Sequence, residues 1–112
     1  MPDLSSQVLP QIQTHRLKGL SLTEDLVMPY YEGFSLVNLP ATVTQLLGAA
    51  TFGQPPLDAI ISDPLGGPYT KVVFLLVDAL GYHLFQEMTH PKRDLLWGRY
   101  FEQAVFSPIT SI

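Results

Sequence analysis

The chain has 112 residues, of which 46% are hydrophobic and 14% charged. This length suffices for one small domain, but soluble domains usually carry about 25% charged residues. We therefore expect part of the surface to be covered, either by the remainder of a larger protein or by a second subunit in a homodimer. The net charge of −4 and the lack of a basic stripe exclude a nucleic-acid polymer as partner. The absence of cysteine excludes disulfides and thiolate metal sites.

The sequence predicts a cytoplasmic protein without a membrane partner. Its start, Met1-Pro2-Asp3-Leu4, lacks the positively charged residues and apolar core of a secretory signal. The longest purely apolar run covers residues 72–77, far short of the roughly 18 residues that span a bilayer.

Residues 1–28 form an N-terminal segment of mixed polarity, in which no regular element is predicted. Residues 29–112 form the remaining domain. Its first predicted element is a helix within 35–48, where Pro40 fits the first turn and Gly48 marks the end. A loop rich in glycine and proline follows at 53–70.

The clearest predicted element is a strand at 71–77. Its apolar run is continuous and rich in β-branched residues, which is typical of a strand buried on both faces. The spacing of Leu80, Leu84, Phe85 and Met88 then predicts a helix, and a second helix is predicted after Asp94. The fold class expected is α/β, with a mixed or parallel sheet that helices cover on both faces. We expect this sheet to be incomplete at the C-terminus, since sheets commonly have about five or six strands.

Asp78 is the principal candidate site residue, because it directly follows the predicted strand. Ligands of open α/β sheets bind at the carboxyl ends of the strands, so this carboxylate can hold a metal ion. Asp78 can equally cap the following helix. A phosphatase of the haloacid dehalogenase type is excluded, because Leu80 stands where that family needs a second aspartate.

The run Lys71-Val72-Val73-Phe74-Leu75-Leu76-Val77-Asp78-Ala79-Leu80-Gly81 resembles the opening of the alkaline phosphatase superfamily, in particular its type I phosphodiesterase/nucleotide pyrophosphatase branch. The stretch at 30–39 is similar to the lead-in of bacterial members. One departure is Ala79, which stands where that family usually has glycine.

The resemblance implies that Asp78 binds one of two divalent metal ions, usually zinc, and that residues 29–112 are the N-terminal part of an α/β hydrolase-type domain. It also implies a threonine or serine nucleophile that forms a covalent phospho-enzyme. Thr110 is one candidate. In the alignment that we prefer, residues 108–112 precede the nucleophile, which is then not among these residues.

Two functions remain open from the sequence. The first is metal-dependent hydrolysis of phosphate monoesters or diesters, with a small phosphorylated substrate and only the first metal ligand in these 112 residues. The second is a non-catalytic α/β binding or interaction module, in which Asp78 is a helix cap.

Overall fold

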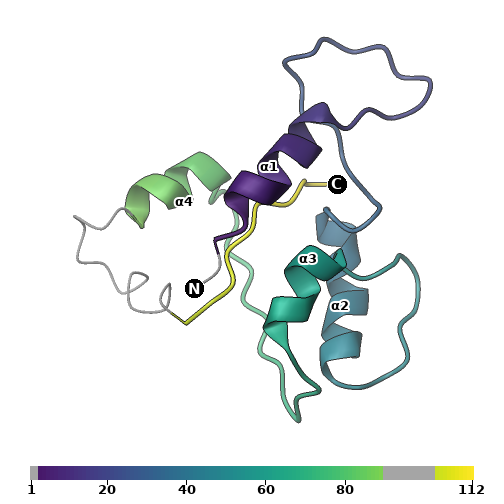
Figure 1. The fold of residues 1–112 in the computed structure, drawn as a ribbon, viewed down its shortest axis with the longest axis vertical. Coiled ribbons are helices and arrows are strands. Elements are labelled where there is room, and N and C mark those ends of the chain that lie inside the picture. The colour runs from purple at the N-terminus through teal and green to yellow at the C-terminus, as the bar shows by residue number, and fades with distance from the viewer. Residues whose placement is uncertain (1–2, 90–102) are drawn as a thin grey trace.

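The regular structure of the chain is helical in the part that the computed structural model describes, residues 3–89 and 103–112. The elements are α1 (Ser5–Thr14), a 3-10 turn η1 (Leu36–Asn38), α2 (Leu39–Leu46), α3 (Ala59–Ser62), a 3-10 turn η2 (Asp63–Leu65) and α4 (Tyr82–Met88). In Figure 1, α2 and α3 lie on one side of α1 and α4 lies on the other. Within the described ranges, no helix is long and apolar enough to cross a membrane.

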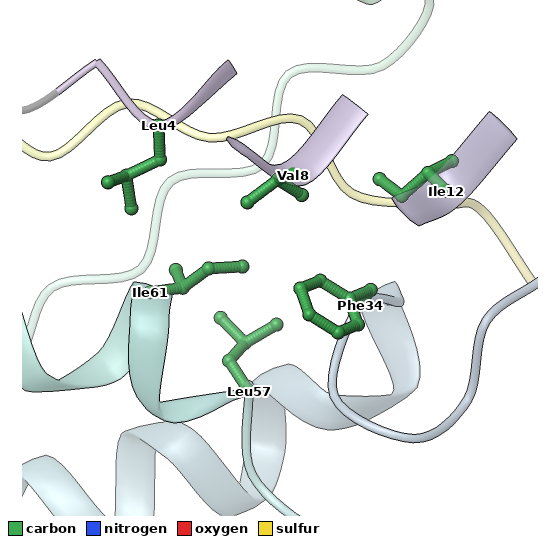
Figure 2. Packing of buried hydrophobic residues seen from close by; sticks show 6 residues of the cluster. All are labelled: Leu4, Val8, Ile12, Phe34, Leu57 and Ile61. Atoms are coloured by element: carbon green, nitrogen blue, oxygen red, sulfur yellow. The ribbon is translucent and has the colours of Figure 1, made fainter. Parts of the chain in front are cut away.

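A small apolar core joins the N-terminal helix to the middle of the chain. Figure 2 shows side chains of α1 and its N-cap directed toward Phe34, toward Leu57 in the loop before α3 and toward Ile61 of α3. The members of this buried cluster are Leu4, Val8, Ile12, Phe34, Leu57 and Ile61. The core thus draws residues from both sides of the predicted division at residue 28.

Helix α1 is not predicted from the sequence, although its apolar residues recur every four positions. Leu4, Val8 and Ile12 are buried on one face, which is the spacing of one side of an α-helix. At the start of the helix, the carboxylate of Asp3 accepts a hydrogen bond of 2.9 Å from the Ser5 N–H. Burial of that face against the core, rather than local propensity, accounts for this helix.

The buried side chain of Asn38 connects three separate stretches of backbone. Its amide nitrogen donates to the carbonyls of Tyr31, at 2.7 Å, and Pro55, at 2.8 Å. Its amide oxygen accepts from the N–H of Ser35 at 2.9 Å. Every polar atom of the side chain is therefore partnered, which is what a fully buried amide requires.

The expected α/β sheet is wrong for this chain. The described residues contain no sheet, and their only β-type pairing consists of two isolated parallel bridges, Asp3 with Phe106 and Ser35 with Thr110. Residues 71–77 have no regular secondary structure, and no backbone hydrogen bond joins them to another segment within the described ranges. A β-strand forms only where a neighbouring strand accepts and donates its backbone hydrogen bonds. An apolar run in the sequence indicates a preference for burial, but it does not indicate whether such a neighbour is present.

The helix predicted within 35–48 is confirmed as η1 and α2, with Pro40 in the first turn of α2. Gly48 follows this helix with φ +70°, a conformation that glycine adopts without strain. The helix predicted from Leu80 is also present, but it begins at Tyr82. The helix predicted after Asp94 lies outside the described residues.

Candidate functional site

Asp78 lies in the short connection between the apolar run 72–77 and helix α4. It is exposed, and its Oδ1 accepts a 2.8 Å hydrogen bond from the N–H of Ala79. The N-cap of α4 is Gly81, and no side chain caps this helix. The expected capping role of Asp78 is therefore wrong, because the helix starts too far along the chain for this carboxylate to reach its first free N–H groups.

Ala79 has a backbone conformation that glycine usually occupies. Its φ of +60° is the only positive φ among the non-glycine residues in the described ranges. A Cβ atom in this left-handed region crowds the backbone and costs roughly 1–2 kcal/mol. Ala79 stands where the resembled family usually has glycine, and a glycine at this position would adopt the same φ without backbone strain.

A pocket of about 760 Å³ adjoins Asp78. We call it the Asp78 pocket; it is lined by Leu36 and by residues 76–82, 85, 106–109 and 111. The pocket therefore lies between the connection that carries Asp78, the start of α4 and the C-terminal segment. No arginine, lysine or histidine is among these lining residues.

Aromatic side chains hold α4 against the C-terminal segment on one wall of this pocket. The rings of Tyr82 and Phe106 stack with centroids 5.9 Å apart and planes 11° apart. Phe85 adds a second contact to Phe106, at 5.4 Å and 27°. Such stacked pairs contribute about 0.5–1.5 kcal/mol beyond the apolar area that they bury, so they fix this wall of the pocket.

Thr110, the candidate nucleophile, points away from the Asp78 pocket and into the protein. Its side chain is 5% exposed and is not among the pocket-lining residues. The hydroxyl donates to the Phe34 carbonyl at 3.0 Å and accepts from the Tyr30 N–H at 2.9 Å. The structure thus uses this hydroxyl to join the C-terminal segment to residues 30–34.

Two serines line the pocket, and the sequence pattern did not single them out. Ser111 is exposed, and Ser107 is half-buried with its hydroxyl donating to the Pro108 carbonyl at 3.1 Å. Successive side chains of an extended segment alternate between its two sides. Because Thr110 points inward, its neighbour Ser111 faces the other way. This alternation is the sequence feature that predicts which hydroxyl reaches the pocket.

The Asp78 carboxylate suits a divalent metal ion in its chemistry. It is exposed, and only one hydrogen bond, to one of its two oxygens, occupies it. Carboxylate oxygens are ligands of zinc, magnesium and manganese. Within the described ranges, however, no group of three histidine or acidic side chains forms a metal cluster. Asp78 therefore fits as one ligand, and the described residues do not complete a metal centre.

Comparison with protein-family models, with curated proteins and with solved structures found no match for this chain.

Proposed function

We propose that the chain contributes Asp78 as a metal ligand to an enzyme that hydrolyses phosphate monoesters or diesters with two divalent metal ions, zinc in the resembled family. The observation that carries this proposal is the exposed Asp78 carboxylate on a pocket whose described lining residues include no basic side chain. The resemblance of residues 71–81 to the phosphodiesterase/nucleotide pyrophosphatase branch supports the same chemistry.

The charge of the pocket explains why a metal is needed. A phosphate ester is anionic, and in the Asp78 pocket it would meet a carboxylate, while the described lining residues offer no lysine, arginine or histidine to offset the repulsion. A divalent ion held by Asp78 reverses the sign of the charge that the substrate meets. When bound, such ions stabilise the attacking and leaving oxygens during displacement at phosphorus.

The hydroxyl nucleophile of this proposal is not Thr110, because its hydroxyl is buried and has two backbone partners. Ser107 and Ser111 are the serine residues that line the pocket with Asp78. The remaining metal ligands come from groups outside the described residues. The first test is therefore metal and phosphate binding rather than turnover.

Manganese titration followed by NMR tests the role of Asp78. Mn²⁺ broadens the amide resonances of residues near its site, so we expect selective broadening at 77–81 and 107–111. Asp78→Asn should abolish this broadening, whereas Asp63→Asn, which removes an exposed carboxylate elsewhere, should leave it unchanged. Inorganic phosphate should then perturb the same resonances only when Zn²⁺ is present. Broadening that persists in Asp78→Asn would overturn the proposal.

An interaction module is the second candidate function. The observation that favours it is the exposure of the apolar side chains at 73–77, because exposed contiguous apolar surface marks sites of protein association. Phosphate binding that fails with and without metal, combined with stable association of the chain with itself or another protein, would favour this candidate.

A further inference from the structure

Tyr82 places a phenol on the wall of the Asp78 pocket, four residues after Asp78 itself. The residue is half-buried and stands in the first turn of α4. Its ring stacks on that of Phe106, which lines the same pocket, with centroids 5.9 Å apart and planes 11° apart. The stacking holds the ring against the C-terminal segment, so the hydroxyl oxygen has a defined position while its proton can rotate.

The Tyr82 hydroxyl accepts a hydrogen bond from Gln86, one turn further along α4. The side-chain nitrogen of Gln86 donates to the Tyr82 oxygen at 2.7 Å. Gln86 is exposed and is not among the residues that line the pocket, so its amide approaches the hydroxyl from outside. Because the amide is the donor in this contact, the phenol proton is not used in it. Within residues 3–89 and 103–112, no acceptor takes that proton.

This arrangement makes Tyr82 a hydrogen-bond donor toward the pocket. A hydroxyl that accepts one hydrogen bond donates its own more strongly, since the bonds in a chain polarise one another. Among the described lining residues, the other side-chain donors are Ser107 and Ser111. The hydroxyl of Ser107 already donates to the Pro108 carbonyl at 3.1 Å. In a described lining without basic residues, the phenol is thus a group that can hydrogen-bond to an anionic oxygen.

We propose that the Tyr82 hydroxyl, oriented by Gln86, donates a hydrogen bond to a non-bridging oxygen of the phosphate group bound in the Asp78 pocket. This inference rests on the proposed function and assigns the residue that orients its substrate. A directional donor fixes how the phosphate group is turned, which neutralisation of charge alone does not. Hydrogen bonds to charged acceptors are stronger than those between neutral groups, so the affinity for phosphate should depend on this proton.

Titration with inorganic phosphate at saturating Zn²⁺, followed by NMR, tests the role of Tyr82. Tyr82→Phe keeps the stacked ring and removes only the hydroxyl, so the dissociation constant of phosphate should rise about tenfold or more. The broadening by Mn²⁺ should match that of the unmodified chain, because Asp78 is still present. Tyr69→Phe is the matched control. The Tyr69 hydroxyl donates to the Leu65 carbonyl, and neither residue lines this pocket, so this variant should leave the affinity unchanged.

A double-variant cycle tests whether Gln86 acts through Tyr82. Gln86→Met removes the amide that orients the hydroxyl and should raise the dissociation constant of phosphate about threefold. In the Tyr82→Phe background the same substitution should have no further effect, because no hydroxyl is left to orient. Equal losses in the two backgrounds would show that Gln86 supports the fold independently and would overturn its positioning role.

Failure of this inference and failure of the proposed function give different results. Zinc-dependent phosphate binding that is equally tight in Tyr82→Phe would overturn the role of Tyr82 and leave Asp78 as a metal ligand. Loss of the Mn²⁺ broadening in Tyr82→Phe would show that the tyrosine supports the metal site instead of the phosphate, which also overturns the inference. No phosphate binding by the unmodified chain at saturating Zn²⁺ would overturn both.

Discussion

Replacing Thr110 by valine should destabilise the protein by about 2–3 kcal/mol, because it removes two hydrogen bonds without changing the shape of the side chain. The hydroxyl accepts from the Tyr30 N–H at 2.9 Å and donates to the Phe34 carbonyl at 3.0 Å. Each intramolecular hydrogen bond contributes about 0.5–1.5 kcal/mol net, and a donor left unpaired in a buried site adds to the loss. The Phe34 carbonyl keeps its 2.7 Å bond from the Thr110 N–H, which limits the total.

Urea unfolding followed by circular dichroism measures this loss. Thr110→Ser is the matched control, since it keeps the hydroxyl and gives up only a methyl group, at a cost of about 1 kcal/mol. We expect valine to cost clearly more than serine, with an unchanged dependence on urea concentration. If valine costs less than about 0.5 kcal/mol, or no more than serine, the hydroxyl does not hold the C-terminal segment and the reasoning fails.

Two glycine-related substitutions test the backbone. Ala79→Gly should be neutral or stabilise the protein by about 0.5 kcal/mol, because relief of the strained left-handed conformation offsets the flexibility that glycine adds to the unfolded chain. Thermal unfolding measures this change in stability. A loss of about 1 kcal/mol would contradict the presence of backbone strain at Ala79. Gly33→Ala should cost about 2 kcal/mol more than Gly19→Ala in the same assay. Both glycines have positive φ, but a Cβ at Gly33 would lie 2.8 Å from the Asp58 backbone nitrogen, whereas Gly19 has nothing within 4 Å. Equal losses would show that conformational strain, not the close approach, determines the cost.

The predicted helix at 35–48 succeeded because its determinants are local. Pro40 fixes the first turn, and Gly48 provides the left-handed residue after the last turn. Both effects act within a few residues and can be read directly from the sequence. Helix α1 was missed because its stability comes from burial of Val8 and Ile12 against Phe34 and Ile61, which are distant in sequence.

The sheet was predicted wrongly because a strand depends on partners that the pattern of its own residues does not reveal. The composition of 72–77 indicates a preference for extended, buried backbone, whereas the structure gives these residues no regular secondary structure and leaves the side chains of 73–77 exposed. Only part of the candidate site was predictable from the sequence. The exposed position of Asp78 after this run follows from the sequence, whereas the burial of Thr110 depends on Tyr30 and Phe34, more than 70 positions away.

The side chain of Asn38 makes three loops a single unit of local unfolding. Tyr31, Ser35 and Pro55 each release a hydrogen bond to this one amide when their backbone moves away. Movement of any one of these backbone segments therefore leaves a polar atom of Asn38 buried without a hydrogen-bond partner. This cost adds to the free energy of local unfolding of each segment. The amide hydrogen of Ser35, which donates to this side chain, consequently exchanges with solvent more slowly than that of an ordinary short loop.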